Sequence, residues 1–172
     1  MRRGRQVQGT VTVALFVSTY ANKVDKKGRV SVPATFRKAL EAESFNGIFC
    51  FESLSKPCLQ GGGQSYIEML QAAIEQEFDP LTDDQDDFAT TLLSGSTPLS
   101  IDGDGRVTLT QELIEIGGFS DTVTFVGMGG FFEIWEPEAF AAHRAQARVR
   151  AKDKRALLLR PRTPAAPASE EG

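Results

Sequence analysis

The feature that most constrains this 172-residue chain is a short internal repeat. Residues 24–32 (VDKKGRVSV) align without gaps on residues 101–109 (IDGDGRVTL), and an Asp-x-x-x-Arg pattern occurs in each copy. Self-similarity of this kind indicates that one supersecondary unit occurs twice and that the copies help to cover each other's apolar side. We therefore expect two similar halves within one fold.

Both copies continue alike. A short helix is expected after each repeat, at residues 33–40 after a proline suited to a first turn, and at residues 111–116 before the Gly117-Gly118 pair. Strand-like segments and then longer helices follow, at residues 48–51, 64–78, 123–126, 131–135 and from 137 onward. Residues 82–93 predict a further helix with acidic first turns, which the helix dipole favours. The order strand, loop, strand, short helix, strand, strand, helix predicts the α+β class.

Each half is too small to bury a sufficient core alone, so we expect the two halves to share one core. If they pack as pseudo-twofold partners, the two Asp-x-x-x-Arg loops face the same way or lie side by side. The expected division is a basic extension at 1–15, a first repeat at 16–78, a connecting helix at 79–95, a second repeat at 96–140, a basic helix at 141–160 and a disordered tail at 161–172.

The repeated loops carry the clearest chemistry. The aspartate can accept backbone N–H bonds, the glycine adopts a conformation that other residues resist, and the arginine leaves on the next strand. A guanidinium fixed on a hairpin can bond phosphate or guanine in forked geometry, although Asp and Arg can also pair merely to pin the turn. The expected loop-shaping residues are Asp25, Gly28, Asp102 and Gly105. The expected DNA-contacting residues are Arg29, Arg106, Lys23, Lys26 and Lys27.

The two loops differ in charge. The second loop has Asp104 where the first has Lys27, so we expect Arg106 to be the weaker contact or mainly structural. The net charge is −4, yet 17 of the 19 Lys and Arg fall in residues 1–5, 23–38 and 144–162, while residues 41–138 hold 19 of the 23 acidic residues. Since attraction to phosphate acts within a Debye length, an acidic body with basic loops can still bind DNA.

Other kinds of site find little support. Cys50 and Cys58 form neither a disulfide framework nor a ligand set, and His143 is expected on a solvated helix face. Residues 102–113 begin like a calcium loop but place Arg106 and Leu113 where ligands are needed. We expect no enzyme activity, metal, cofactor, small-molecule substrate or membrane span. The expected location is cytoplasmic and nucleoid-associated. The aromatic residues at 125, 131, 132 and 135 are expected in the core. The basic helix from 137 to about 159 could be solvated, a second DNA contact or an oligomer contact.

With these motifs, the chain resembles the MraZ family of regulators associated with bacterial division and cell-wall gene clusters. The resemblance covers most of residues 16–140. It depends on VDKKGRVSVPATFR, KPCL at 56–59, LLSG at 92–95, IDGDGRVTL and VGMGGFFEIWE. It implies a duplicated AbrB-like swapped-hairpin fold, ring-shaped homo-oligomers, and repression through double-stranded DNA at direct repeats upstream of the protein's own gene cluster. By motif match, Arg29 and Arg106 would contact DNA.

Two departures from the family pattern stand out. Gln60 and the glycines at 61–63 replace the usual apolar residues, which predicts a shortened last strand in the first repeat. Family members also tend to begin near the equivalent of Phe16, so residues 1–15 are either a native basic extension or the product of an upstream start assignment.

The alternative function is an AbrB-type interaction module or ring scaffold, such as an antitoxin, with purely structural loops. Antitoxins of that type usually carry one copy, and an enzyme is a distant third.

Overall fold

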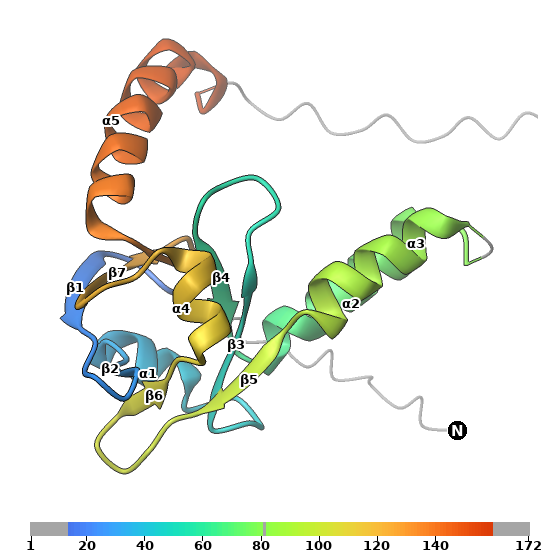
Figure 1. Cartoon of the computed structure of the whole chain (residues 1–172). Helices are drawn as coiled ribbons and strands as arrows, with labels where there is room; N and C mark the ends of the chain where they lie inside the picture. Colours follow the sequence, from blue (N-terminus) through green and yellow to red (C-terminus); the bar gives the residue numbers. More distant parts are fainter. Residues whose placement is uncertain (1–13, 81, 160–172) are drawn as a thin grey trace, which may run out of the picture.

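The computed structural model describes residues 14–80 and 82–159 and has the expected α+β class (Figure 1). The expected basic extension lies mostly, and the tail entirely, outside the described residues. The strands are β1 (Thr19–Lys23), β2 (Arg29–Ser31), β3 (Gly47–Glu52), β4 (Leu59–Gly62), β5 (Thr97–Ser100), β6 (Arg106–Thr108), β7 (Thr122–Gly127) and β8 (Phe132–Trp135). The helices are α1 (Ala34–Leu40), α2 (Gln64–Glu77), α3 (Asp83–Phe88), α4 (Gln111–Gly117) and α5 (Pro137–Asp153). A π-helical turn, Ala89–Ser94, continues α3, and a 3-10 turn, Arg155–Leu157, follows α5.

Six strands form one antiparallel sheet in the order β1-β7-β8-β4-β3-β5. The two repeats exchange their first strands. β1 of the first half pairs with β7 of the second, and β5 of the second half pairs with β3 of the first. The counterparts in the two repeats are β1 and β5, β3 and β7, and β4 and β8. If each strand is replaced by its counterpart, the same strand order results, read from the opposite edge of the sheet. The centre of this pseudo-symmetry lies between β4 and β8, which pair with each other.

The two short strands β2 and β6 form a separate antiparallel ribbon. Val30 lies opposite Val107 in this ribbon, and both valines are 1% exposed. Because side chains alternate along a strand, the valines occupy the ribbon's inner face and their neighbours its outer face. The ribbon lies at the end of the molecule opposite α5 (Figure 1).

The main apolar core draws on both halves and holds them together. Its buried cluster draws on the first half through Phe16, Phe36 and Ile48, and on the second through Phe125 and Phe132. The Phe36 ring meets the rings of Phe16 and Phe132 with centroids 5.2 Å and 5.3 Å apart, which is the spacing aromatic pairs favour.

The glycines at the end of the first repeat do not shorten its strand. β4 runs through Gln60, Gly61 and Gly62 and has four residues, as does β8, so the expected shortening is wrong. A Cβ at Gly61 would lie 2.6 Å from Cε2 of Phe132, and one at Gly62 would lie 2.7 Å from Tyr66. The glycines therefore make room for aromatic rings that pack closely against this strand.

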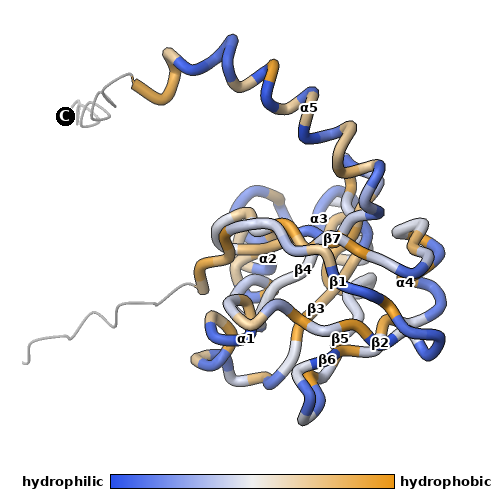
Figure 2. The backbone as a smooth tube through the Cα atoms, turned by 90° about the vertical axis from the view of Figure 1, so that its left-hand side faces the viewer, coloured by the Kyte–Doolittle hydropathy of each residue, from blue (hydrophilic) through white to orange (hydrophobic). Residues whose placement is uncertain are grey.

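The helical segments α2–α3 and α5 extend from the sheet in different directions (Figures 1 and 2). At its start α5 packs on β8, where the Trp135 ring stacks on His143 with centroids 4.7 Å apart. His143 is therefore half-buried against Trp135, so its helix face is only partly solvated. Among residues 14–80 and 82–159, no helix is long and apolar enough to cross a membrane.

Candidate nucleic-acid interface

A single carboxylate organises the first Asp-x-x-x-Arg loop. Oδ1 of Asp25 accepts hydrogen bonds from the backbone N–H groups of Lys27 and Arg29, each at 2.9 Å. Oδ2 accepts a further bond from Nε of Arg29 at 2.6 Å. Gly28 has a φ of +79°, a backbone conformation that favours glycine, as the sequence predicts. The loop therefore fixes the direction in which the Arg29 side chain leaves the ribbon.

The second loop repeats this geometry with one addition. Asp102 accepts backbone bonds from Asp104 and Arg106 at 2.9 Å each, and a side-chain bond from Nε of Arg106 at 3.2 Å. Gly105 has a φ of +75°. In addition, Nη2 of Arg106 donates to Asp104 at 2.8 Å. Two carboxylates therefore engage Arg106, whereas Arg29 is engaged only through Nε within the described residues.

Each loop is hydrogen-bonded to the residue that follows the ribbon strand of the other repeat. The N–H of Leu109 donates to the carbonyl of Gly28 at 2.8 Å, and the N–H of Val32 donates to the carbonyl of Gly105 at 3.0 Å. In the ribbon Arg29 lies opposite Thr108, and Arg106 lies opposite Ser31.

The register places both arginines on the outer face of the ribbon, since the two valines occupy the inner face. The side chains of Arg29 and Arg106 are 35% and 30% exposed, so water reaches both guanidinium groups. The two cations therefore lie on one face of a rigid, two-stranded platform, one at each end, because the strands that the loops precede are antiparallel.

The loop carboxylates favour their charged forms. The pKa of Asp25 is lowered from its ordinary value of 3.8, chiefly by the hydrogen bond from the backbone N–H of Arg29. The pKa of Asp102 is lowered in the same way by the backbone N–H of Arg106. Both carboxylates are therefore ionised at neutral pH and pair with the arginines.

The remaining sequence-predicted cations flank the first loop. Lys26 and Lys27 lie in the loop, Lys23 ends β1, and all three are exposed. No corresponding lysine lies in the second loop. The cationic surface is therefore concentrated around Arg29.

A further cation, Arg37 on α1, was missed by the sequence analysis. A Cβ at Gly105 would overlap the Arg37 guanidinium, so this group packs directly on the second loop. Nε of Arg37 is buried and has no hydrogen-bond partner in the described structure. The aligned residue is Ile114, which lies against Gly28 of the first loop. The difference between Arg37 and Ile114 at aligned positions is visible in the sequence. It shows that Arg37 lies at the second loop only once the exchange of strands between the halves is known.

Both cysteines lie outside the two loops and are buried. Burial raises the pKa of the Cys50 thiol to about 12. The pKa of Cys58 is also raised to about 12, first by burial and then by the nearby charge of Glu133. Both thiols are therefore protonated at neutral pH and are poor nucleophiles.

Comparisons with known proteins agree with the motifs. A family model described as "MraZ protein, putative antitoxin-like" matches residues 92–160. Proteins named transcriptional regulator MraZ from Pelagibacter ubique and Rickettsia akari are each 42% identical over 144 residues, which is 84% of this chain and 92% and 96% of theirs. The Rickettsia bellii protein of that name is 43% identical over 145 residues, or 84% of this chain and 96% of its own. This chain therefore belongs to the MraZ family.

Proposed function

We propose that the chain is a sequence-specific DNA-binding transcriptional regulator that contacts double-stranded DNA through the outer face of the β2–β6 ribbon. The observation that carries the proposal is the pair of arginines held by carboxylates on one face of that ribbon. A guanidinium fixed in this way loses little freedom on binding and can bond phosphate or guanine in a fork. The names of the relatives support regulation of transcription as the purpose.

The finer parts of the proposal follow from the family resemblance. We propose that the protein represses its own division and cell-wall gene cluster, that it binds direct repeats upstream, and that several copies form a ring in the cytoplasm at the nucleoid. The exchange of β1 and β5 between halves supports a duplicated swapped-hairpin fold. One ribbon buries little DNA surface, so a ring that presents several ribbons to spaced repeats gains affinity through effective concentration.

The two arginines should contribute unequally. Within the described residues the Arg29 side chain bonds through Nε alone, and three lysines flank it in the sequence, whereas Arg106 also donates to Asp104. Arg37 brings a further cation to the second loop, beside Gly105. We therefore assign the stronger DNA contact to Arg29 and a weaker, partly structural role to Arg106.

A gel shift with the DNA immediately upstream of the gene tests this assignment. Arg29→Ala should weaken binding at least about tenfold, because a forked contact contributes about 1–3 kcal/mol per site. Arg106→Ala should have a smaller effect. Arg150→Ala on α5 is the matched control and should bind like the wild type, while circular dichroism shows that each variant is folded. Unchanged affinity of Arg29→Ala would overturn the assignment.

The second candidate is a protein-interaction module of the antitoxin kind, with loops that are structural. The description of the matching family model and the Asp–Arg pairs within both loops favour it. It predicts that the purified wild type shows no sequence preference in the same gel shift, even with the fold intact. A preference for the upstream DNA over a shuffled duplex would reject this candidate.

A further inference from the structure

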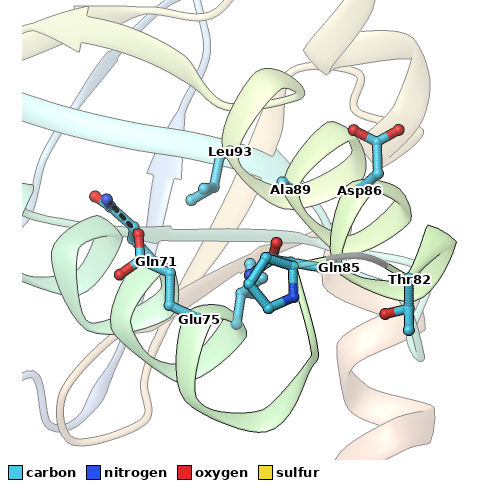
Figure 3. Close-up of a pocket in the computed structure, with 9 residues that line it drawn as sticks. Gln71, Glu75, Thr82, Gln85, Asp86, Ala89 and Leu93 are labelled. Carbon is cyan, nitrogen blue, oxygen red and sulfur yellow. Dashed lines mark hydrogen bonds between the residues drawn. The ribbon is translucent and has the colours of Figure 1, made fainter.

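A groove lies between α2 and the segment formed by α3 and its π-helical continuation (Figure 3). Its volume is about 280 Å³. Apolar side chains of Ile74 and Leu93 contribute to its lining, and the carboxylates of Glu75 and Asp86 come from its two walls. The groove therefore combines apolar surface with negative charge on opposite sides.

The surroundings of the groove are also acidic. α3 begins with Asp83, Asp84 and Asp86 in its first turn, and Asp87 follows. These side chains are exposed, and no ion pair joins them to a cation within the described residues. A surface of this charge attracts a cationic partner and repels an acidic one.

The same chain carries the complementary surface on α5. Arg144 and Arg148 are four residues apart and lie on one face of α5, and Arg155 follows in the 3-10 turn after the helix ends at Asp153. They are exposed and form no ion pair within the described residues. The exposed apolar residues Leu157 and Leu158 follow them, at 56% and 90% exposure. This end of the chain therefore combines cationic and apolar surface, which complements the acidic and apolar lining of the groove.

These two surfaces cannot meet within one copy, because α5 and the α2–α3 segment leave the sheet in different directions (Figure 1). We propose that α5 of one copy docks into the α2–α3 groove of a second copy. Arginine stems would cover the half-buried Leu93, beside the buried Ile74, while their guanidinium groups pair with Glu75 and Asp86. Two different surfaces meet in this contact, so in a pair of copies one retains a free groove and the other retains a free α5.

Such a head-to-tail contact builds a ring when its rotation closes. The inference therefore rests on the proposed homo-oligomer and supplies its contact surfaces, while the DNA contact through the ribbon is independent of it. Attraction between exposed charges is screened by salt, so assembly should weaken as ionic strength rises.

A charge-swap experiment on the full chain tests the inference. The helix variant is Arg148→Glu with Arg155→Glu, and the groove variant is Glu75→Lys with Asp86→Lys. Each alone should raise the dissociation constant of self-assembly at least about tenfold, measured by sedimentation, because close charge pairs across an interface couple strongly. An equimolar mixture should form complexes again, because the α5 of the helix variant is now acidic and the groove of the groove variant is basic.

The controls each place one charge reversal of the same kind outside the two surfaces. Glu77→Lys lies on α2 outside the groove lining, and Arg150→Glu lies on α5 away from the arginine face. Both should assemble like the wild type, and circular dichroism should show every variant folded.

Four outcomes would overturn the inference. They are a monomeric wild type, variants that assemble normally, a mixture that fails to recover, and loss of assembly that the controls share. The proposed DNA function fails separately, if Arg29→Ala leaves the gel shift unchanged while the charge-swapped mixture still assembles.

Discussion

At the scale of single residues, one carboxylate in each loop holds both the turn and the arginine. Asp25 and Asp102 accept two backbone bonds and one side-chain bond each, so the loops have nearly the same hydrogen-bond pattern. Their glycines have the same positive φ but different neighbours. Because the loops share their geometry but differ in their neighbours, the same substitution in each loop should have different effects.

Gly28→Ala should destabilise the protein more than Gly105→Ala. Both substitutions put a side chain at positive φ, which costs of order 1–3 kcal/mol. A Cβ at residue 28 would also lie 2.6 Å from the backbone carbonyl oxygen of Leu109, whereas one at residue 105 would meet the Arg37 side chain, which can move. We expect a further loss of at least about 1 kcal/mol for Gly28→Ala in urea unfolding. Equal losses would show that the backbone around Leu109 yields easily.

The Asp25 carboxyl should titrate below its ordinary value of 3.8, because the Arg29 backbone N–H and side chain favour the charged form and lower its pKa. A lowered folded-state pKa means that the loop's stabilisation is complete above pH 3.8. It is lost as the pH falls through the folded pKa. Carbon-13 NMR of the carboxyl group measures the midpoint. Arg29→Ala should move that midpoint part of the way back, since the backbone bond remains, and a wild-type midpoint at or above 3.8 would contradict the assignment.

At the scale of elements, the two repeats are joined by a partly buried ion pair as well as by paired strands. Nζ of Lys56, in the loop between β3 and β4, lies 2.5 Å from Oε1 of Glu133 on β8. Glu133 is 1% exposed and its other oxygen accepts a bond from the Trp135 indole at 2.8 Å. The sequence showed the KPCL and FFEIW segments only as separate motifs. Their contact depends on the pairing of β4 with β8.

Removing only the lysine should be costly. Lys56→Met leaves the buried Glu133 carboxylate without its cation and should lower the free energy of unfolding by about 3 kcal/mol. Adding Glu133→Gln removes the uncompensated charge but keeps an acceptor for the Trp135 indole. The double variant should therefore recover much of the loss in chemical denaturation. If it is less stable than Lys56→Met alone, the carboxylate charge is not the source of the instability.

At the scale of the whole molecule, the sequence predicted the class, most elements and the two loops. It could do so because the repeat, the glycines and the alternating apolar residues are local signals. The pairing of β1 with β7 and β5 with β3 could not be read locally, since antiparallel partners in either half would satisfy the same pattern. For the same reason the sequence alone could not predict that Arg37 lies at the second loop.

The exchanged strands predict that neither half folds alone as a monomer. A cut after Gly95, between the π-helical turn and β5, leaves β1, β2 and β4 without their partners β7, β6 and β8. Each fragment would also expose its share of the common core to water, which small domains cannot afford. Residues 1–95 and 96–172 should each lack a cooperative unfolding transition as monomers, and an equimolar mixture should regain one near that of the intact chain. Because the repeats are similar, a fragment could instead pair with itself, so sedimentation accompanies the unfolding curves. A fragment that is monomeric and unfolds cooperatively would show that its half is an independent domain, and that the strand exchange joins two folds instead of creating one.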